Sequence, residues 1–183
     1  MHTFIAHLSQ SVFHFNRKLL LAGALIAAAP TITSCAKQNK PQDAAAATAE
    51  SDSIEARQMA KEEAFLAQKA KEPGVQSLGG GLLYKVLRAG KGAQPTSTSM
   101  VTVDYEGKLI DGTIFDSSYQ RGQTATFGVT QVIKGWTEAL KLMPVGSTYE
   151  LCIPYNLAYG EHGNRTIPPF ATLIFKVELI AIK

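Results

Sequence analysis

The chain is poor in the residues that build disulfides, metal sites and redox centres. Its 183 residues include two cysteines, four histidines and one tryptophan. Cys35 lies in an N-terminal signal-like stretch, whereas Cys152 lies in the apolar run 149–153. We therefore expect Cys152 to be a buried thiol that packs as a small hydrophobic group, not half of a disulfide. No pair of histidines or cysteines has the spacing of a metal site, so no metal is expected.

A strong charge bias is also missing. Lys and Arg together number 18 and Asp and Glu 15, which gives a formal net charge of +3. That excess is too small to indicate a nucleic-acid-binding surface. The sequence also has no glycine-rich phosphate loop and no serine nucleophile elbow. No cofactor is expected, and the common phosphoryl-transfer and hydrolase classes have no support.

An apolar N-terminal segment predicts export. Arg17 and Lys18 precede an apolar run over residues 19–29, which is too short to span a bilayer comfortably and is typical of a secretory signal. The run leads to Ile32-Thr33-Ser34-Cys35, which resembles the lipobox of bacterial lipoproteins. We expect residues 1–34 to be a lipoprotein signal peptide, with the true start downstream of Met1.

This signal predicts a location for the mature protein. Cys35 would carry the lipid, and the protein would be exported and anchored to a bacterial membrane, the outer membrane facing the periplasm. The alternative is a plain signal peptide with a chance cysteine.

The next segment reads as a tether followed by one helix. Residues 35–52 have no large apolar side chain after the cysteine and cannot bury enough surface to fold. Asp52 or Ser53 is the expected N-cap of a helix within residues 53–73. Its apolar residues form only a loose stripe: Ile54, Met59, Phe65 and Leu66. A solvated spacer and a monomeric protein are favoured, with a dimerisation or partner-binding helix as alternatives.

The remainder, residues 74–183, has the period-two pattern of strands. The predicted strands are 83–88, 100–110, 113–116 with a continuation at 125–127, 148–153 and 171–182. Asp111-Gly112 is a hairpin signal between the second and third of these. Five antiparallel strands with one short helix predict an α+β domain.

The short helix contains the single tryptophan. Trp136, Ala139, Leu140 and Met143 follow helical spacing, and Pro144 ends the helix. Two helical turns are not stable alone in water. We therefore expect this helix to plug the concave face of the sheet.

Aromatic and aliphatic residues gather near the loop ends, where ordinary core packing would explain only part of them. They are Tyr105, Phe115, Val132, Ile133, Trp136, Tyr159, Ile167 and Phe175. His162, the single histidine of this domain, lies in a polar loop and is expected to be solvated rather than catalytic.

The order of five sequence blocks resembles a known family. The blocks are Val103 to Gly107, Asp111 to Ser118, Gln131 to Trp136, Ala158 to Gly160 and Ile167 to Phe175. Together they are similar to the FKBP-type peptidyl-prolyl cis-trans isomerases over Gly81 to Lys183. The segment from Phe65 to Leu83 also resembles the helix-to-domain junction of the macrophage-infectivity-potentiator-like bacterial subfamily.

The resemblance implies a fold and a site. The fold would be a five-stranded antiparallel half-barrel wrapped around the helix that begins near Lys134. The implied catalytic residues are Asp116, Trp136, Tyr159 and Phe175. The implied substrate-binding residues are Tyr105, Phe115, Val132, Ile133 and Ile167, the last through its backbone amide.

The resemblance also implies an activity. The chain would accelerate rotation about X-Pro bonds in proline-containing polypeptides and assist their folding, and macrolide inhibitors are candidate ligands. The alternative is a non-catalytic chaperone or binding module that uses the same pocket.

Overall fold

The structure is a computed structural model and describes residues 42–183. The signal peptide expected over residues 1–34 and the expected lipidation site, Cys35, lie outside the described residues. The elements run in the order α1 (Gln42–Lys69), β1 (Val75–Ser77), the 3-10 helix η1 (Gly79–Gly81), β2 (Leu83–Arg88), β3 (Met100–Lys108), β4 (Ile114–Ser117), α2 (Ser118–Arg121), β5 (Ala125–Gly128), α3 (Lys134–Leu140), β6 (Thr148–Ile153), the 3-10 helix η2 (Tyr155–Leu157) and β7 (Leu173–Ile182).

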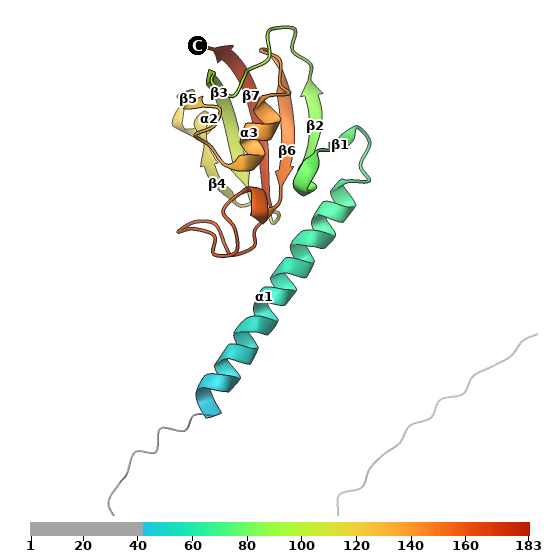
Figure 1. The fold of residues 1–183 in the computed structure, drawn as a ribbon, viewed down its shortest axis with the longest axis vertical. Coiled ribbons are helices and arrows are strands. Elements are labelled where there is room, and N and C mark those ends of the chain that lie inside the picture. Colours follow the sequence, from blue (N-terminus) through green and yellow to red (C-terminus); the bar gives the residue numbers. More distant parts are fainter. Residues whose placement is uncertain (1–41) are drawn as a thin grey trace, which may run out of the picture. The chain divides into compact units, whose positions relative to one another are not determined.

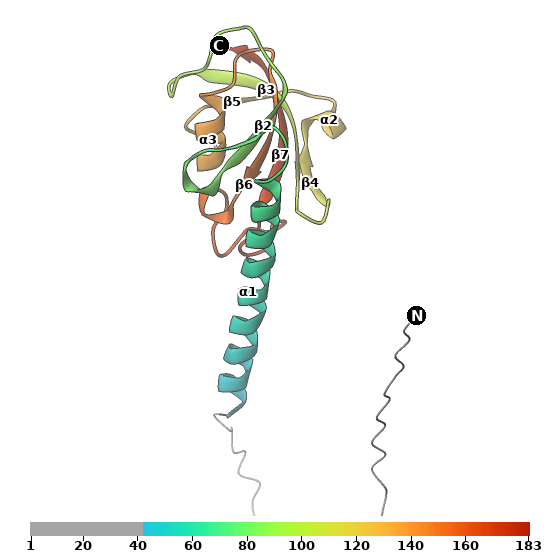
Figure 2. The same cartoon turned by 90° about the vertical axis from the view of Figure 1, so that its right-hand side faces the viewer.

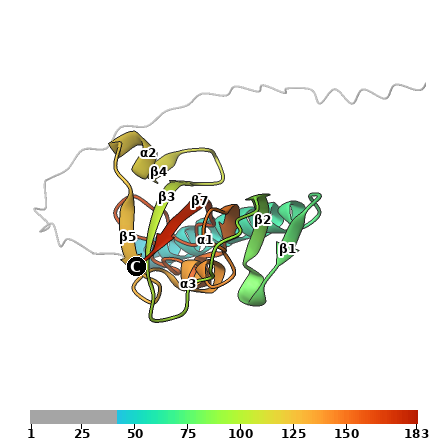
Figure 3. The ribbon, with the colours of Figure 1, turned by 90° about the horizontal axis from the view of Figure 1, so that it is seen from above.

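The strands form one antiparallel sheet, as predicted for the α+β fold. Its order is β1-β2-β6-β7-β3-β4, and β5 also pairs with β3. Figure 3 shows β1 and β2 at one end of this sheet and β4 and β5 at the other. The central strand β3 alternates buried and half-buried residues along most of its length, so Val101, Val103 and Tyr105 face the core.

The sheet has more strands than the sequence pattern predicted. β1 pairs with β2 through residues 75–77, a run too short to show a period of its own. The predicted edge over residues 113–127 divides into two strands that pair with opposite ends of β3. The turn α2 separates them, because the Ser117 side chain accepts a hydrogen bond from the Gln120 amide and Gly122 ends the turn at φ 65°.

The short helix α3 lies against one face of the sheet, as expected (Figures 1 and 2). Its predicted apolar stripe is buried in the main core, with Leu140 and Met143 fully inaccessible to solvent. The helix ends at Leu140, three residues before Met143, and the chain continues to Pro144 through hydrogen bonds that span three residues. Gly135 permits the close approach, since a Cβ there would lie 2.4 Å from Cγ2 of Ile153 in β6.

Helix α1 differs from the prediction at its start. It begins at Gln42, inside the segment expected to be a tether, and ends at Lys69. The reason is helix propensity: residues 44–47 are four consecutive alanines, the best helix former, and outweigh the lack of large apolar groups. Asp52 and Ser53 are therefore internal helical residues, and neither is the N-cap. The Ser53 hydroxyl donates to the Glu50 carbonyl oxygen at 2.8 Å.

The second half of α1 packs on the sheet face opposite α3. Phe65 and Leu66 contact a small cluster formed by Leu83, Cys152 and Ile174, which are neighbours across β2, β6 and β7. Lys69 adds an ion pair with Glu150 at 3.3 Å. Among residues 42–183, no helix is long and apolar enough to cross a lipid bilayer.

Candidate active site

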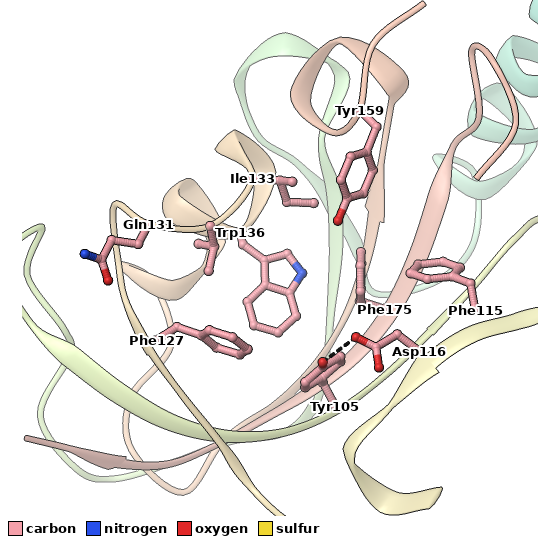
Figure 4. Close-up of a pocket in the computed structure, with 10 residues that line it drawn as sticks. Tyr105, Phe115, Asp116, Phe127, Gln131, Ile133, Trp136, Tyr159 and Phe175 are labelled. Carbon is pink, nitrogen blue, oxygen red and sulfur yellow. Dashed lines mark hydrogen bonds between the residues drawn. The ribbon is translucent and has the colours of Figure 1, made fainter. Parts of the chain in front are cut away.

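A pocket opens between α3 and the concave face of the sheet (Figure 4). Its volume is about 480 Å³. It is lined by Tyr105, Phe115, Asp116, Phe127, Gln131, Val132, Ile133, Trp136, Tyr159 and Phe175. The sheet strands and α3 supply rigid walls, because most of these side chains come from regular elements or their ends.

The floor of the pocket is Trp136. Its indole ring makes edge-to-face contacts with Tyr105, Phe127 and Phe175 at centroid distances of 5.3, 5.9 and 5.3 Å. Such pairs are favourable because the positive edge of one ring meets the negative face of another. Trp136 Nε1 is buried without a hydrogen-bond partner, and Figure 4 shows it directed toward Phe175. The indole N–H is therefore shielded from solvent inside the aromatic cluster.

The wall beside the floor depends on a glycine. Phe115 and Phe175 pack edge to face at 5.5 Å. Gly107 lies between them, since it pairs with Asp116 of β4 on one side and with Phe175 of β7 on the other. A Cβ on Gly107 would lie 2.6 Å from an atom of each phenylalanine ring. The absent side chain is therefore what lets these two rings meet over β3.

One side of the pocket is polar. The Tyr105 hydroxyl donates to Asp116 Oδ2 at 2.5 Å and accepts from Arg121 Nη2 at 2.9 Å. Arg121 also pairs with Asp116 Oδ1, and its guanidinium carbon lies 5.5 Å from the centre of the Tyr105 ring. Burial and, after it, the hydrogen bond to Asp116 raise the pKa of Tyr105, while Arg121 opposes that rise. Tyr105 therefore stays a neutral hydroxyl near neutral pH, held in place by two charged partners.

The predicted site residues come together in this pocket, with one exception. Every member of the predicted set lines it except Ile167. The Ile167 side chain is buried in the core, and its amide donates to Asn164 Oδ1 at 3.0 Å. The same oxygen accepts from the Thr166 amide at 2.9 Å, so the Asn164 side chain binds two backbone amides of its own loop. The sequence did not show that a nearby side chain would compete for the Ile167 amide.

Three residues of the site were missed from the sequence. Phe127 lies in the predicted strand continuation 125–127, and its being a large aromatic residue there was the available signal. Gln131 adjoins the Val132-Ile133 pair. Arg121 had no signal, because its contacts to Tyr105 and Asp116 depend on how α2 folds back on β3.

The other reactive residues of the domain lie elsewhere. His162 is exposed and does not line the pocket. Cys152 lies on the opposite face of the sheet, and burial raises the pKa of its thiol to about 12, which leaves it unreactive as a nucleophile. In the part of the chain that the structure describes, no three His, Cys, Asp or Glu side chains gather as a metal site would require.

Two family models match the chain. Residues 91–180 match the model described as FKBP-type peptidyl-prolyl cis-trans isomerase. Residues 5–86 match the model described as the domain amino terminal to FKBP-type peptidyl-prolyl isomerase.

Curated relatives resemble the chain closely over part of their length. The chain is 56% identical over 119 residues to the FKBP-type 22 kDa peptidyl-prolyl cis-trans isomerase of Escherichia coli, an alignment that covers 64% of the chain and 58% of that protein. It is 55% identical over 124 residues to peptidyl-prolyl cis-trans isomerase Mip of Coxiella burnetii, covering 67% of the chain and 54% of that protein. The chain thus spans little more than half the length of these relatives.

Solved structures extend the likeness to the fold. A peptidyl-prolyl cis-trans isomerase from Pseudomonas syringae is 41% identical, with a TM-score of 0.65 over 68% of the chain and 92% of that structure. FkpA from Escherichia coli is 40% identical, with a TM-score of 0.69 over 82% of the chain and 75% of that structure. The aromatic pocket, the matched models and these structures agree, and the chain belongs to the FKBP-type peptidyl-prolyl cis-trans isomerase family.

Proposed function

We propose that the chain is a peptidyl-prolyl cis-trans isomerase that accelerates rotation about X-Pro bonds in exported polypeptides. The observation that carries this proposal is the aromatic pocket: Trp136 forms a buried floor, and the rings of Tyr105, Phe127 and Phe175 pack around it. A pocket of about 480 Å³ that is lined mainly by aromatic and aliphatic side chains, with a few polar groups, has the size and character of a small-ligand site.

The pocket suits a reaction in which no covalent bond changes. Rotation about a peptide bond faces a barrier of about 18–20 kcal/mol, because the planar amide loses its resonance on twisting. The twisted amide is less polar than the planar one, so a dry aromatic surface favours it over the ground state, which water solvates better. Each 1.4 kcal/mol or so of that preference gives about a tenfold gain in rate.

The polar side orients the substrate in this proposal. Asp116 and the Tyr105 hydroxyl are held by each other and by Arg121, so they offer fixed dipoles beside the rings. Tyr159 stands at the rim, 42% exposed, with its hydroxyl free to reach a substrate carbonyl group. Asp116, Trp136, Tyr159 and Phe175 are the proposed catalytic residues. Tyr105, Phe115, Val132 and Ile133 are proposed to bind the substrate, and an Ile167 amide contact requires Asn164 to release it.

A proline-peptide isomerisation assay tests the activity. The chain should raise the cis-to-trans rate at catalytic concentration, and Trp136→Ala should lower kcat/KM by about tenfold or more, because the floor opens to water. Tyr119→Ala is the matched control, since this aromatic side chain is exposed outside the pocket. If the protein binds the peptide without accelerating rotation, the binding-module alternative holds instead. Competition by a macrolide inhibitor would test the remaining ligand prediction.

We also infer that the protein is exported and lipid-anchored through Cys35. The lipobox-like sequence ending at that cysteine supports this, and a relative from Legionella longbeachae that is 53% identical over 125 residues is named outer membrane protein MIP. Cys35→Ala should move the protein from the membrane to a soluble or unprocessed fraction. Unchanged membrane partitioning of a processed Cys35→Ala protein would contradict this.

We further propose that the protein is monomeric. Phe65 and Leu66 pack against the sheet of the same chain. The large exposed apolar side chains between residues 50 and 69 are then Ile54 and Met59. Two such residues form too narrow a seam for a stable dimer. Light scattering at micromolar concentration should give the monomer mass, and a dimer mass lost on Ile54→Asp would refute this.

A further inference from the structure

Helix α1 carries a buried carboxylate that the sheet packing does not explain. Glu62 is 3% exposed, and it is the one charged residue among the buried side chains of the described chain. Its neighbours Lys61 and Glu63 are exposed. A charged group is rarely buried unless its oxygens are paired, so this position calls for specific partners.

Both oxygens of Glu62 have such partners. Oε2 accepts a hydrogen bond from the Thr172 amide at 3.0 Å, across 110 positions of sequence. Oε1 accepts from Gln58 Nε2, one helical turn earlier, at 2.6 Å. Hydrogen bonds to an ionised acceptor are stronger than those between neutral groups. The contact therefore holds α1 to the residue immediately before β7.

Thr172 closes a segment that borders the pocket. We call residues 155–171 the rim segment: it runs from η2 to the start of β7 and carries Tyr159. The segment is tied internally, because the Gly160 amide donates to the Tyr155 carbonyl oxygen at 2.8 Å and the Phe170 amide donates to the Gly160 carbonyl oxygen at 3.3 Å. The rings of Tyr155 and Phe170 also pack edge to face at 5.3 Å.

A segment tied in this way is positioned mainly by its two ends. Its entry follows the buried Pro154 at the end of β6, and its exit is Thr172, which is 1% exposed. Phe170, two residues before that exit, has φ 58°, a left-handed conformation that a non-glycine residue keeps only when its surroundings fix it. β7 begins at Leu173, and Phe175 of the pocket lies three residues beyond Thr172.

We propose that Glu62 is a positioning residue for the pocket: its buried carboxylate, carried on α1, fixes the junction between the rim segment and β7. This inference rests on the proposed isomerase function. Helix α1 is then part of the site's support rather than a spacer, and Tyr159 lies correctly at the rim only while α1 is docked. The packing of Phe65 and Leu66 and the Lys69 to Glu150 ion pair hold the helix where Glu62 reaches Thr172.

Three substitutions in the full chain test this role. Glu62→Ala removes both acceptors, Glu62→Gln keeps one acceptor oxygen of the same reach, and Glu63→Ala is the matched control on an exposed neighbour. Glu62→Ala should raise KM for a proline peptide about threefold to tenfold, which is the change expected when the hydrogen bond to the Thr172 amide is lost. The value of kcat should change by less than about twofold. Glu62→Gln and Glu63→Ala should stay within about twofold of the unchanged protein.

Amide hydrogen exchange gives a second measurement that needs no activity. The Thr172 amide should exchange at least about tenfold faster in Glu62→Ala, and the rim segment should follow, because their shared anchor is lost. Unchanged Thr172 exchange in Glu62→Ala, or an equal rise of KM in the Ala and Gln variants, would overturn the proposal. If the unchanged chain does not isomerise the peptide, the proposed function fails, whereas the exchange data still decide whether Glu62 anchors the rim.

Discussion

The aromatic wall of the pocket should be sensitive to a single methyl group at Gly107. In Gly107→Ala, the new Cβ would lie 2.6 Å from Cζ of Phe115 and 2.6 Å from Cε1 of Phe175. Ordinary contact between carbon atoms needs about 3.5–4.0 Å, so each ring must move by roughly 1 Å. The rings cannot both move without disturbing Trp136, which packs on Phe175 at 5.3 Å.

The expected size of the effect follows from two opposing contributions. Overpacking a filled core costs about 1–3 kcal/mol. Replacing glycine by alanine returns about 0.4–1 kcal/mol by restricting the unfolded chain. We expect a net loss of about 1–2 kcal/mol in the free energy of unfolding. The displaced rings also reshape the wall, so kcat/KM should fall by about tenfold, equivalent to about 1.4 kcal/mol of transition-state stabilisation.

Two assays measure these losses, and a matched glycine provides the control. Urea unfolding reports stability, and proline-peptide isomerisation reports activity. Gly79→Ala adds the same methyl group where no atom lies within 4 Å, so it should raise stability by about 0.4–1 kcal/mol and leave activity unchanged. Gly107→Ala with the stability and activity of Gly79→Ala would refute the claim that the two rings need this empty space.

Three further predictions concern other residues. Because burial raises the pKa of Tyr105, its hydroxyl stays protonated, and kcat/KM should be nearly flat from about pH 6 to 8. The activity of His162→Ala should be close to that of the unchanged chain. A bell-shaped pH profile that His162→Ala abolishes would indicate proton transfer instead. Phe175→Ala should destabilise the fold by about 3–5 kcal/mol and cut activity, which circular dichroism and the peptide assay can separate. The thiol of Cys152 favours its neutral form in the fold, so the stability that it contributes is present below its ordinary pKa and lost as pH rises toward 12. Cys152→Val should therefore lose less stability than the unchanged chain between about pH 9 and 12, and equal alkaline unfolding curves would contradict this.

Local patterns in the sequence were enough to predict the sheet and its plug. Period-two alternation located β2, β3, β6 and β7 nearly to the residue, because strands with one buried face must alternate. The stripe that begins at Trp136 predicted a short buried helix, because so short a helix needs packing to be stable. The start of α1 at Gln42 also follows from local sequence, because the helix propensity of the alanine run outweighs the absence of bulky apolar residues.

Most of the pocket could also be predicted from the sequence: large aromatic and aliphatic residues at the ends of recognisable elements indicated its wall, and the family resemblance implied their roles and added Asp116. Contacts between distant segments could not be predicted in this way. Arg121 reaches Tyr105 only because α2 turns back on β3, and the Ile167 amide is occupied because Asn164 folds onto it. Side-chain partners of this kind are chosen by three-dimensional proximity, which spacing along a chain does not encode.

The sequence by itself therefore determined which segments are strands and which short helix must be buried, since both follow from hydrophobic periodicity. The tertiary structure decided which polar groups satisfy one another. Glu62 shows the difference most clearly: within its helix it is an ordinary acidic residue beside Glu63, and nothing in its neighbours marks it as buried. It lies 110 positions from the Thr172 amide that binds it, and only the docking of α1 on the sheet brings the two together and excludes water from both.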